Sequence, residues 1–113
     1  IETNAANLRV TGQLDVRTAD VASVLAELPR PDAVFVGGGL EGEVLQRCWA
    51  ALGTGGRLVA HSVTADSDTV LLEGYRRWGG ELGRIGVEVA EPIGRFTGFR
   101  PLRSVTSWAA TKR

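Results

Sequence analysis

Apolar positions along the chain change their period several times, and these changes predict alternating helices and strands. Residues 33–36 form a short apolar run after a proline, with a helical pattern on each side, which is typical of a parallel strand buried on both faces. Residues 57–62 contain a second run of this kind. Helical periods that end at glycine or proline cover residues 21–28, 42–52 and 64–78. This alternation predicts an α/β fold around a parallel sheet.

The two ends of the chain carry weaker patterns. Residues 1–8 have the spacing of a helix end, and residues 14–18 alternate as a short strand near a sheet edge does. Residues 82–89 also alternate, over a length that is too great for a strand covered on both faces. Residues 91–104 are rich in glycine, proline and arginine and are expected to form a loop, and residues 105–111 a last strand. An antiparallel pair of strands is therefore expected to close the sheet.

Composition narrows the class of protein. The chain has 113 residues, which fits one domain, and 43% of them are hydrophobic, which argues against disorder. Lys plus Arg and Asp plus Glu both number 13, so charge gives no case for nucleic acid or a membrane surface as partner. No apolar stretch is long enough to span a membrane, and the single cysteine cannot form an internal disulfide, so the cytoplasm is the expected compartment. Because the chain begins at Ile1 rather than Met, we expect it to be a piece of a longer protein.

A run of glycines follows the first apolar strand. Gly37, Gly39 and Gly42 satisfy the pattern G-x-G-x-x-G between a strand and a helix, which is the context of a dinucleotide fingerprint. That fingerprint needs an acidic residue at the end of the next strand, where none occurs before Asp66. At least one β-α unit also precedes it. An NAD site is therefore the less favoured interpretation, and a glycine-rich loop at the ligand edge of a parallel sheet is favoured.

Asp20 and His61 follow the ends of predicted strands, and each has two interpretations. Asp20 either caps the helix that starts at Val21 or accepts a hydrogen bond from an adenine amino group, and the residues alone favour the cap. His61 is the only histidine, and a structural or substrate-contacting role is favoured over that of a general base. No spacing of His, Cys or carboxylates suggests a metal site. Four further residues are expected to pack in the core: Cys48, Trp49, Trp78 and Trp108.

Residues 94–103 combine three arginines, two phenylalanines and a threonine within the expected loop. Arginine forks bind carboxylates and phenylalanine faces stack on flat rings, so this set suits a large planar ligand that carries many carboxylates. A solvated basic loop, or a contact between subunits, explains the same composition equally well. The residues alone leave these alternatives open.

Three segments of the chain resemble one enzyme family. They are residues 28–39 (LPRPDAVFVGGG), 79–82 (GGEL) and 91–101 (EPIGRFTGFRP), and the last of them is the most specific. They are similar to the C-terminal part of the cobalamin-pathway precorrin-6Y C(5,15)-methyltransferase (decarboxylating) family. The resemblance implies the α/β fold of class I S-adenosylmethionine-dependent methyltransferases, a Rossmann-like sheet closed by an antiparallel strand pair. It also implies that residues 1–113 are the C-terminal two-thirds of one such domain, without its first strands.

The same resemblance implies an activity and its site. The reaction is methyl transfer from S-adenosylmethionine to a ring carbon of a precorrin, a tetrapyrrole, with loss of carbon dioxide from an acetate side chain, and relatives are often homotetramers. The residues implied to contact the cofactor are Ala19, Asp20, Val21, Gly37, Gly38 and Gly39. The residues implied to contact the substrate are His61, Ser62, Thr64, Arg95, Thr97 and Arg100. No catalytic residue and no metal ligand is implied.

The chain also departs from the family pattern. The family's first strand, its glycine-rich cofactor loop and the acidic residue that holds the ribose would all precede Ile1, and Ala19 stands where relatives carry glycine. We therefore expect this chain alone to bind S-adenosylmethionine poorly or not at all, and to expose an apolar sheet edge. A non-catalytic fragment that serves as a subunit-contact or scaffold module is the alternative function, and an NAD-binding domain is a distant third.

Overall fold

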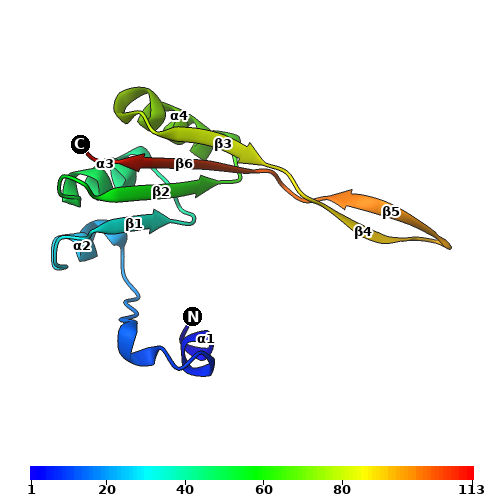
Figure 1. Ribbon diagram of the computed structural model, residues 1–113, viewed down its shortest axis with the longest axis horizontal. Coiled ribbons are helices and arrows are strands. Elements are labelled where there is room, and N and C mark those ends of the chain that lie inside the picture. The colour runs from blue at the N-terminus through cyan, green and yellow to red at the C-terminus, as the bar shows by residue number, and fades with distance from the viewer.

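The computed structural model describes residues 1–113 and consists of a small mixed sheet with helices against one face of it, an N-terminal helical segment that lies apart from the sheet, and a long two-stranded projection (Figure 1). The helices are α1 (Glu2–Asn7), the 3-10 helix η1 (Thr11–Gln13), α2 (Val21–Leu25), α3 (Gly42–Ala51) and α4 (Ala65–Trp78). The strands are β1 (Ala33–Val36), β2 (Arg57–Ser62), β3 (Glu81–Ile85), β4 (Glu88–Ile93), β5 (Phe96–Pro101) and β6 (Val105–Thr111).

The main sheet has the strand order β1-β2-β6-β3. β1 and β2 are parallel, and β6 lies antiparallel to both β2 and β3. The predicted order of strand types along the chain is therefore confirmed, since a parallel pair comes first and an antiparallel pair closes the sheet. None of the helices has the length and hydropathy that a membrane crossing needs.

The core lies between the sheet and the helices α3 and α4. Alternate residues of β2 and β6 point to this side, and the apolar stripes of the two helices cover them. The most deeply buried members come from both layers: Leu45, Cys48, Leu52, Leu58, Ala60, Leu71 and Trp108. The burial of Cys48, at 1% exposure, confirms its predicted place in the core.

The three tryptophans pack together at the edge of this core. Trp108 is fully buried, and its Nε1 donates a hydrogen bond to the carbonyl oxygen of Gly79 at 2.8 Å. The rings of Trp49 and Trp78 stack with centroids 4.7 Å apart, and both lie within 6.0 Å of the Trp108 ring. Their predicted packing role is confirmed.

The prediction that the first apolar strand is buried on both faces is wrong. Val34 and Val36 of β1 pack against the core, but Ala33 is exposed and Phe35 is 64% exposed. The reason is that α3 and α4 cover only one face of the sheet, so alternate residues of β1 face outward. β1 is also an edge strand, as expected, because its one neighbour is β2.

The predicted strand at residues 14–18 does not form, and the following helix is shorter than predicted. Residues 14–18 are exposed, and no strand lies beside them to exchange backbone hydrogen bonds. Helix α2 ends at Leu25 rather than at Leu28, because residues 26–28 are exposed and a short helix persists only where tertiary packing supports it. Asp20 does occupy the N-cap position, although its side chain makes no hydrogen bond to a backbone N–H.

The predicted long strand and loop between residues 82 and 104 are replaced by β3 and a hairpin, which we call the arm (β4, the turn Gly94-Arg95, and β5). Glu88 pairs with Pro101 and Ile93 with Phe96, so the residues expected to form a loop pair with each other instead. Both strands of the arm are edge strands, which tolerate the prolines that made the segment resemble a loop. The arm projects from the sheet (Figure 1), and the Cα radius of gyration is 17.3 Å, against about 13 Å for a compact domain of this length.

Candidate functional site

The carboxyl ends of β1 and β2 bring two predicted parts of the site together. The two strands are parallel, with Val36 opposite Ala60, so the loop that begins at Gly37 lies beside the residues that follow Ala60. The cofactor-side glycines Gly37–Gly39 and the substrate-side residues His61, Ser62 and Thr64 therefore share one edge of the sheet. In open α/β sheets this edge is where ligands bind.

The glycine loop leaves open space at this edge. A Cβ atom added to Gly38 or Gly39 would meet nothing within 4 Å, so a ligand can approach the backbone there. Gly39 has φ +61°, a conformation that favours glycine. The next residue, Leu40, is buried and anchors the loop to the core. The loop is thus fixed at one end and open beside its backbone N–H groups.

His61 packs against an aromatic residue that sequence reasoning did not single out. Its ring meets the ring of Phe35 edge to face, with centroids 5.0 Å apart. Both side chains lie on the face of the sheet that α3 and α4 do not cover, because their neighbours Val36, Ala60 and Ser62 point to the helices. Phe35 was missed because an apolar residue within an apolar run predicts core packing.

Ser62 and Thr64 hold the loop after β2 in place. Ser62 is 5% exposed, and its Oγ donates to the carbonyl oxygen of Thr64 at 3.0 Å. Thr64 is the N-cap of α4, where its Oγ1 accepts a hydrogen bond from the backbone N–H of Ser67 at 3.1 Å. These contacts fix the loop that follows β2, next to His61.

A charged residue of α4 lies beside the same loop. The Thr106 and Ser62 hydroxyls near Asp68 lower the pKa of its carboxyl group, partial burial opposes them, and the Arg84 guanidinium lowers it further. The pKa therefore lies below its ordinary value, and Asp68 is a carboxylate at neutral pH. Sequence reasoning assigns an acid in the first turn of a helix to the helix dipole, so this contact with the sheet was not foreseen.

The predicted adenine-side residues stand at the start of α2. Ala19, Asp20 and Val21 are exposed, and the Asp20 carboxylate accepts a hydrogen bond from the Ser23 hydroxyl at 3.3 Å. Asp20 also accepts the first backbone hydrogen bond of the helix, from Val24. An exposed carboxylate beside a helix start can accept a further hydrogen bond from a ligand.

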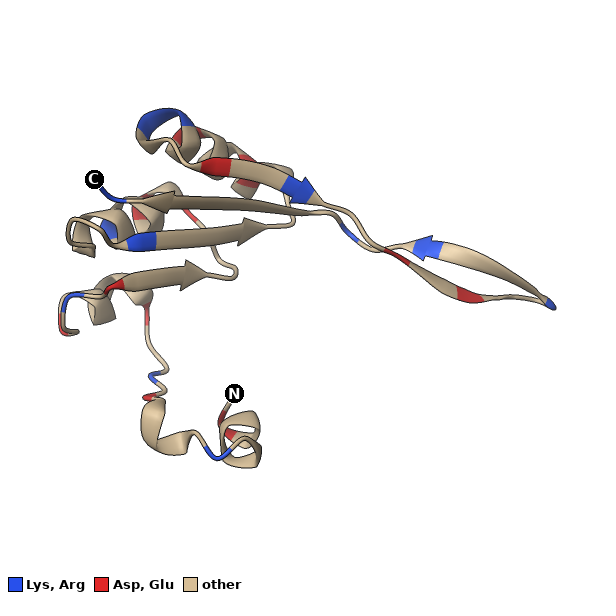
Figure 2. Cartoon of the chain, viewed as in Figure 1, with Lys and Arg blue, Asp and Glu red and all other residues tan.

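The three predicted substrate residues of the arm lie apart from the sheet edge. Arg95 is in the turn of the arm with its guanidinium over the Phe96 ring, and Arg100 donates to the Glu91 carboxylate at 3.0 Å across the hairpin. Thr97 is exposed on β5. Figure 2 shows charges of both signs along the arm, which projects away from the main sheet. The structure thus separates the arm residues from His61, Ser62 and Thr64.

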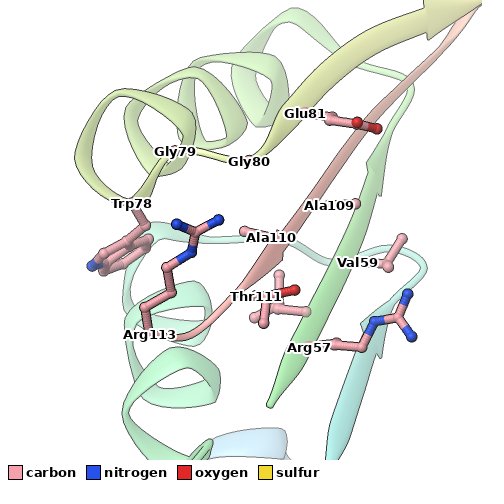
Figure 3. A pocket seen from close by; sticks show the side chains of 11 residues that line it. Arg57, Val59, Trp78, Gly79, Gly80, Glu81, Ala109, Ala110, Thr111 and Arg113 are labelled. Carbon is pink, nitrogen blue, oxygen red and sulfur yellow. The ribbon is translucent and has the colours of Figure 1, made fainter. Parts of the chain in front are cut away.

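A hollow of about 630 Å³ lies at the opposite end of the sheet. It is formed by the amino ends of β2 and β3, the end of β6 and the residues after α4. Arg113 and Trp78 lie at one side of it and Arg57 at the other (Figure 3). None of the predicted site residues lines it, and in open α/β sheets ligands bind at the other edge, so we assign the site to the glycine loop.

Comparison with known proteins points to one family. A family model described as a precorrin methyltransferase domain matches residues 1–112. A precorrin-6Y C(5,15)-methyltransferase (decarboxylating) from Sinorhizobium sp is 46% identical over 110 residues, which are 96% of this chain and 26% of that protein. The crystal structure of the C-terminal domain of precorrin-6Y C5,15-methyltransferase from Rhodobacter capsulatus has a TM-score of 0.92 and 34% identity, over 98% of this chain and 60% of that one.

A second solved structure is similar to the chain in both fold and sequence. A targeted domain of a precorrin-6Y C5,15-methyltransferase from Corynebacterium diphtheriae has a TM-score of 0.90 and 30% identity, over 99% of this chain and 66% of that one. The chain therefore spans about a quarter of the length of the curated relative, at 26%, and less than two-thirds of each solved domain.

Proposed function

The chain belongs to the precorrin methyltransferase domain family and has the class I S-adenosylmethionine-dependent methyltransferase fold, and from this we propose that it is part of an enzyme that methylates and decarboxylates a precorrin in cobalamin biosynthesis. In this proposal residues 1–113 are the C-terminal two-thirds of one methyltransferase domain in a longer cytoplasmic protein. The observation that carries it is the shared sheet edge, where the open glycine loop lies beside His61 of β2 and the loop that follows β2.

The residues on the cofactor side fit S-adenosylmethionine, whose sulfonium supplies an electrophilic methyl group. The open backbone at Gly38 and Gly39 would admit the methionine end of the cofactor, since no side chain occupies that space, and Gly37 beside them lies against the Phe35 ring. The exposed carboxylate of Asp20 would accept a hydrogen bond from the adenine amino group, with Ala19 and Val21 beside it. The role of these residues is to orient the cofactor, because methyl transfer depends on aligning the nucleophilic carbon with the methyl group.

The residues on the substrate side fit a flat molecule with many carboxylates. His61 and Phe35 offer aromatic surface at the site edge, and the hydrogen bond between Ser62 and Thr64 holds the loop that follows His61. Arg95, Thr97 and Arg100 of the arm would supply hydrogen bonds to carboxylates. Because the arm stands away from the sheet edge, this role requires a large substrate or a second subunit.

A second candidate function, that of a subunit contact, rests on the apolar surface of the arm. Phe96 is 66% exposed and Phe99 is 70% exposed, on opposite faces of β5, and Ile93 beside Phe96 is 60% exposed. Exposed apolar surface of this kind marks interaction sites. We therefore propose that the protein is a homo-oligomer, a tetramer as the resemblance implies, in which the arm contributes to the contact between subunits.

The complete protein, incubated with S-adenosylmethionine and precorrin-6Y, tests the enzyme proposal. The expected product has gained methyl groups and lost carbon dioxide, as mass spectrometry would show. In the Gly38→Val variant, the new side chain fills the open space of the loop and is expected to reduce turnover. Gly12→Val, at a second open position far from the loop, is the matched control. Absence of methyl transfer by the folded, complete wild-type protein would contradict the proposal.

A further inference from the structure

A row of polar side chains crosses the main sheet where its core ends. Ser62 of β2 is paired with Thr106 of β6, and Thr106 is paired with Arg84 of β3. Ser62 and Thr106 are each 5% exposed and face the helices. One step further into the sheet the corresponding row is apolar (Ala60, Trp108 and Leu82). The polar row is therefore the boundary of the core at the ligand edge.

Asp68 of α4 lies over this row and joins its members. Its Oδ2 accepts a hydrogen bond from Arg84 Nη2 at 3.1 Å, and Arg84 Nε donates to Thr106 Oγ1 at 3.2 Å. Asp68 Oδ1 is shielded from solvent, and the hydroxyls of Thr106 and Ser62 lie close to the carboxylate without completing a hydrogen bond to Oδ1. A shielded carboxylate oxygen without a hydrogen-bond partner costs free energy, so the carboxylate depends on the charged donor that Arg84 supplies to Oδ2.

Ser62, Arg84 and Thr106 stand where two segments leave the sheet: the loop after β2 and the arm. Ser62 is the last residue of β2, and its hydroxyl donates a hydrogen bond to the carbonyl oxygen of Thr64 in the loop that follows. Arg84 stands at the end of β3, just before the arm, and Thr106 stands at the start of β6, just after it. A further backbone hydrogen bond, from Leu102 to Val87 at 2.9 Å, keeps the two root segments of the arm together. One carboxylate thus contacts the base of the arm on β3 and β6 and lies beside the base of the loop.

We infer that Asp68, with Arg84 and Thr106, is a positioning cluster that holds the root of the arm and the loop after β2 in one fixed arrangement at the ligand edge. This inference deepens the proposed function, on which its catalytic consequence rests. The hydrogen-bond and charge partners of Asp68 are Arg84, Thr106 and Ser62, so its proposed role is one of positioning. In this role Asp68 acts through the arm and the loop after β2, which leave the sheet at the residues that it holds together.

Amide hydrogen exchange of the complete protein tests the geometric part without any substrate. In Asp68→Asn, which removes the charge but keeps the size, exchange is expected to be about tenfold faster in residues 62–68 and 86–104. Arg84→Met, on an exposed side chain that can be removed without disturbing the core, is the second variant and is expected to give the same pattern. Glu43→Gln, which removes an exposed ion pair with Arg47 on α3, is the matched control and should change neither segment.

Two results would overturn the inference. One is unchanged exchange in both segments, which would show that the cluster holds nothing in place. The other is equally faster exchange throughout β2 and β6, which would show that Asp68 contributes only to overall stability.

Kinetics of the same variants test the consequence for the reaction. We expect Asp68→Asn to raise KM for the precorrin about tenfold while KM for S-adenosylmethionine stays within twofold of wild type. Equal changes in both constants would overturn a positioning role for substrate. A wild-type protein without methyltransferase activity would instead contradict the proposed function, and the exchange experiment would still decide the inference.

Discussion

At the scale of single residues, the arm arginines give the sharpest test of substrate binding. Arg95 and Arg100 both have exposed guanidinium groups, one over the Phe96 ring and the other paired with Glu91. In the complete protein, Arg95→Ala and Arg100→Ala are expected to raise KM for the tetrapyrrole by roughly tenfold to a hundredfold and KM for the cofactor much less. The reason is that a hydrogen bond to a charged group contributes about 1.5–3 kcal/mol. Steady-state kinetics with each substrate varied in turn measures both constants.

The control for this experiment is Arg47→Ala, because Arg47 is an exposed arginine in an ion pair on α3, away from the arm. It should leave both constants unchanged. Equal effects of the arm substitutions on KM for the tetrapyrrole and KM for the cofactor would contradict a role of these arginines in substrate binding. A lower molecular mass in solution would then assign these arginines to the subunit contact.

At the scale of elements, the connection from α4 to β3 depends on two adjacent glycines that differ in their surroundings. Both have positive φ, +74° at Gly79 and +91° at Gly80. A Cβ at Gly79 would meet nothing, whereas one at Gly80 would collide with the backbone carbonyl oxygen of Ala109 on β6. Gly79→Ala should therefore cost about 1–3 kcal/mol from backbone strain alone, since φ +74° with ψ −149° is a conformation essentially restricted to glycine, and Gly80→Ala more than about 3 kcal/mol because β6 must also move. Urea unfolding of the two variants measures the difference.

The two variants are each other's control, since both glycines have positive φ and they differ in the space available to a Cβ atom. Equal losses of unfolding free energy would contradict the close approach of Gly80 to β6. The sequence pattern identifies Gly79-Gly80 as the end of a helix but gives no sign that one of the two is in contact with another strand.

At the scale of the whole molecule, the arm is expected to set the oligomeric state. The double substitution Phe96→Ser and Phe99→Ser removes the two most exposed aromatic side chains of the arm. It should lower the molecular mass of the complete protein measured by size-exclusion chromatography with light scattering. Leu72→Ser, at a partly exposed apolar position on α4, is the control and should leave the mass unchanged. A mass that is unaffected by the arm substitutions would contradict a subunit contact through the arm.

The uncovered sheet face leads to a second prediction at this scale. β1 has one neighbour, and Phe35 and His61 face outward, so the residues that would orient the cofactor have support on one side only. The isolated chain of residues 1–113 should therefore bind S-adenosylmethionine with a dissociation constant well above the micromolar range. Isothermal titration measures it, with the complete protein as the positive control. Micromolar affinity of the isolated chain would contradict the prediction.

The sequence by itself determined the elements whose signals are local. β2 and β6 have the predicted bounds, and α3 and α4 differ from prediction by one residue at an end, because apolar periods and terminal glycines or a threonine cap lie within the elements themselves. The glycine loop at the ligand edge and the resemblance to the family were also readable, since both depend on contiguous residues. So was the core position of Cys48, which follows from the helical stripe.

Tertiary structure decided everything that depends on a distant partner. Residues 14–18 alternate as a strand does but have no neighbour to accept their hydrogen bonds. Residues 91–93 and 96–101 lie in the segment that was expected to be a loop, but they form strands because β4 and β5 pair with each other. Phe35 is exposed because helices cover one face of the sheet, which no local pattern encodes. The joining of Asp68 to Arg84 and Thr106 belongs to the same class, since strand pairing and helix packing bring together residues that are far apart in the chain.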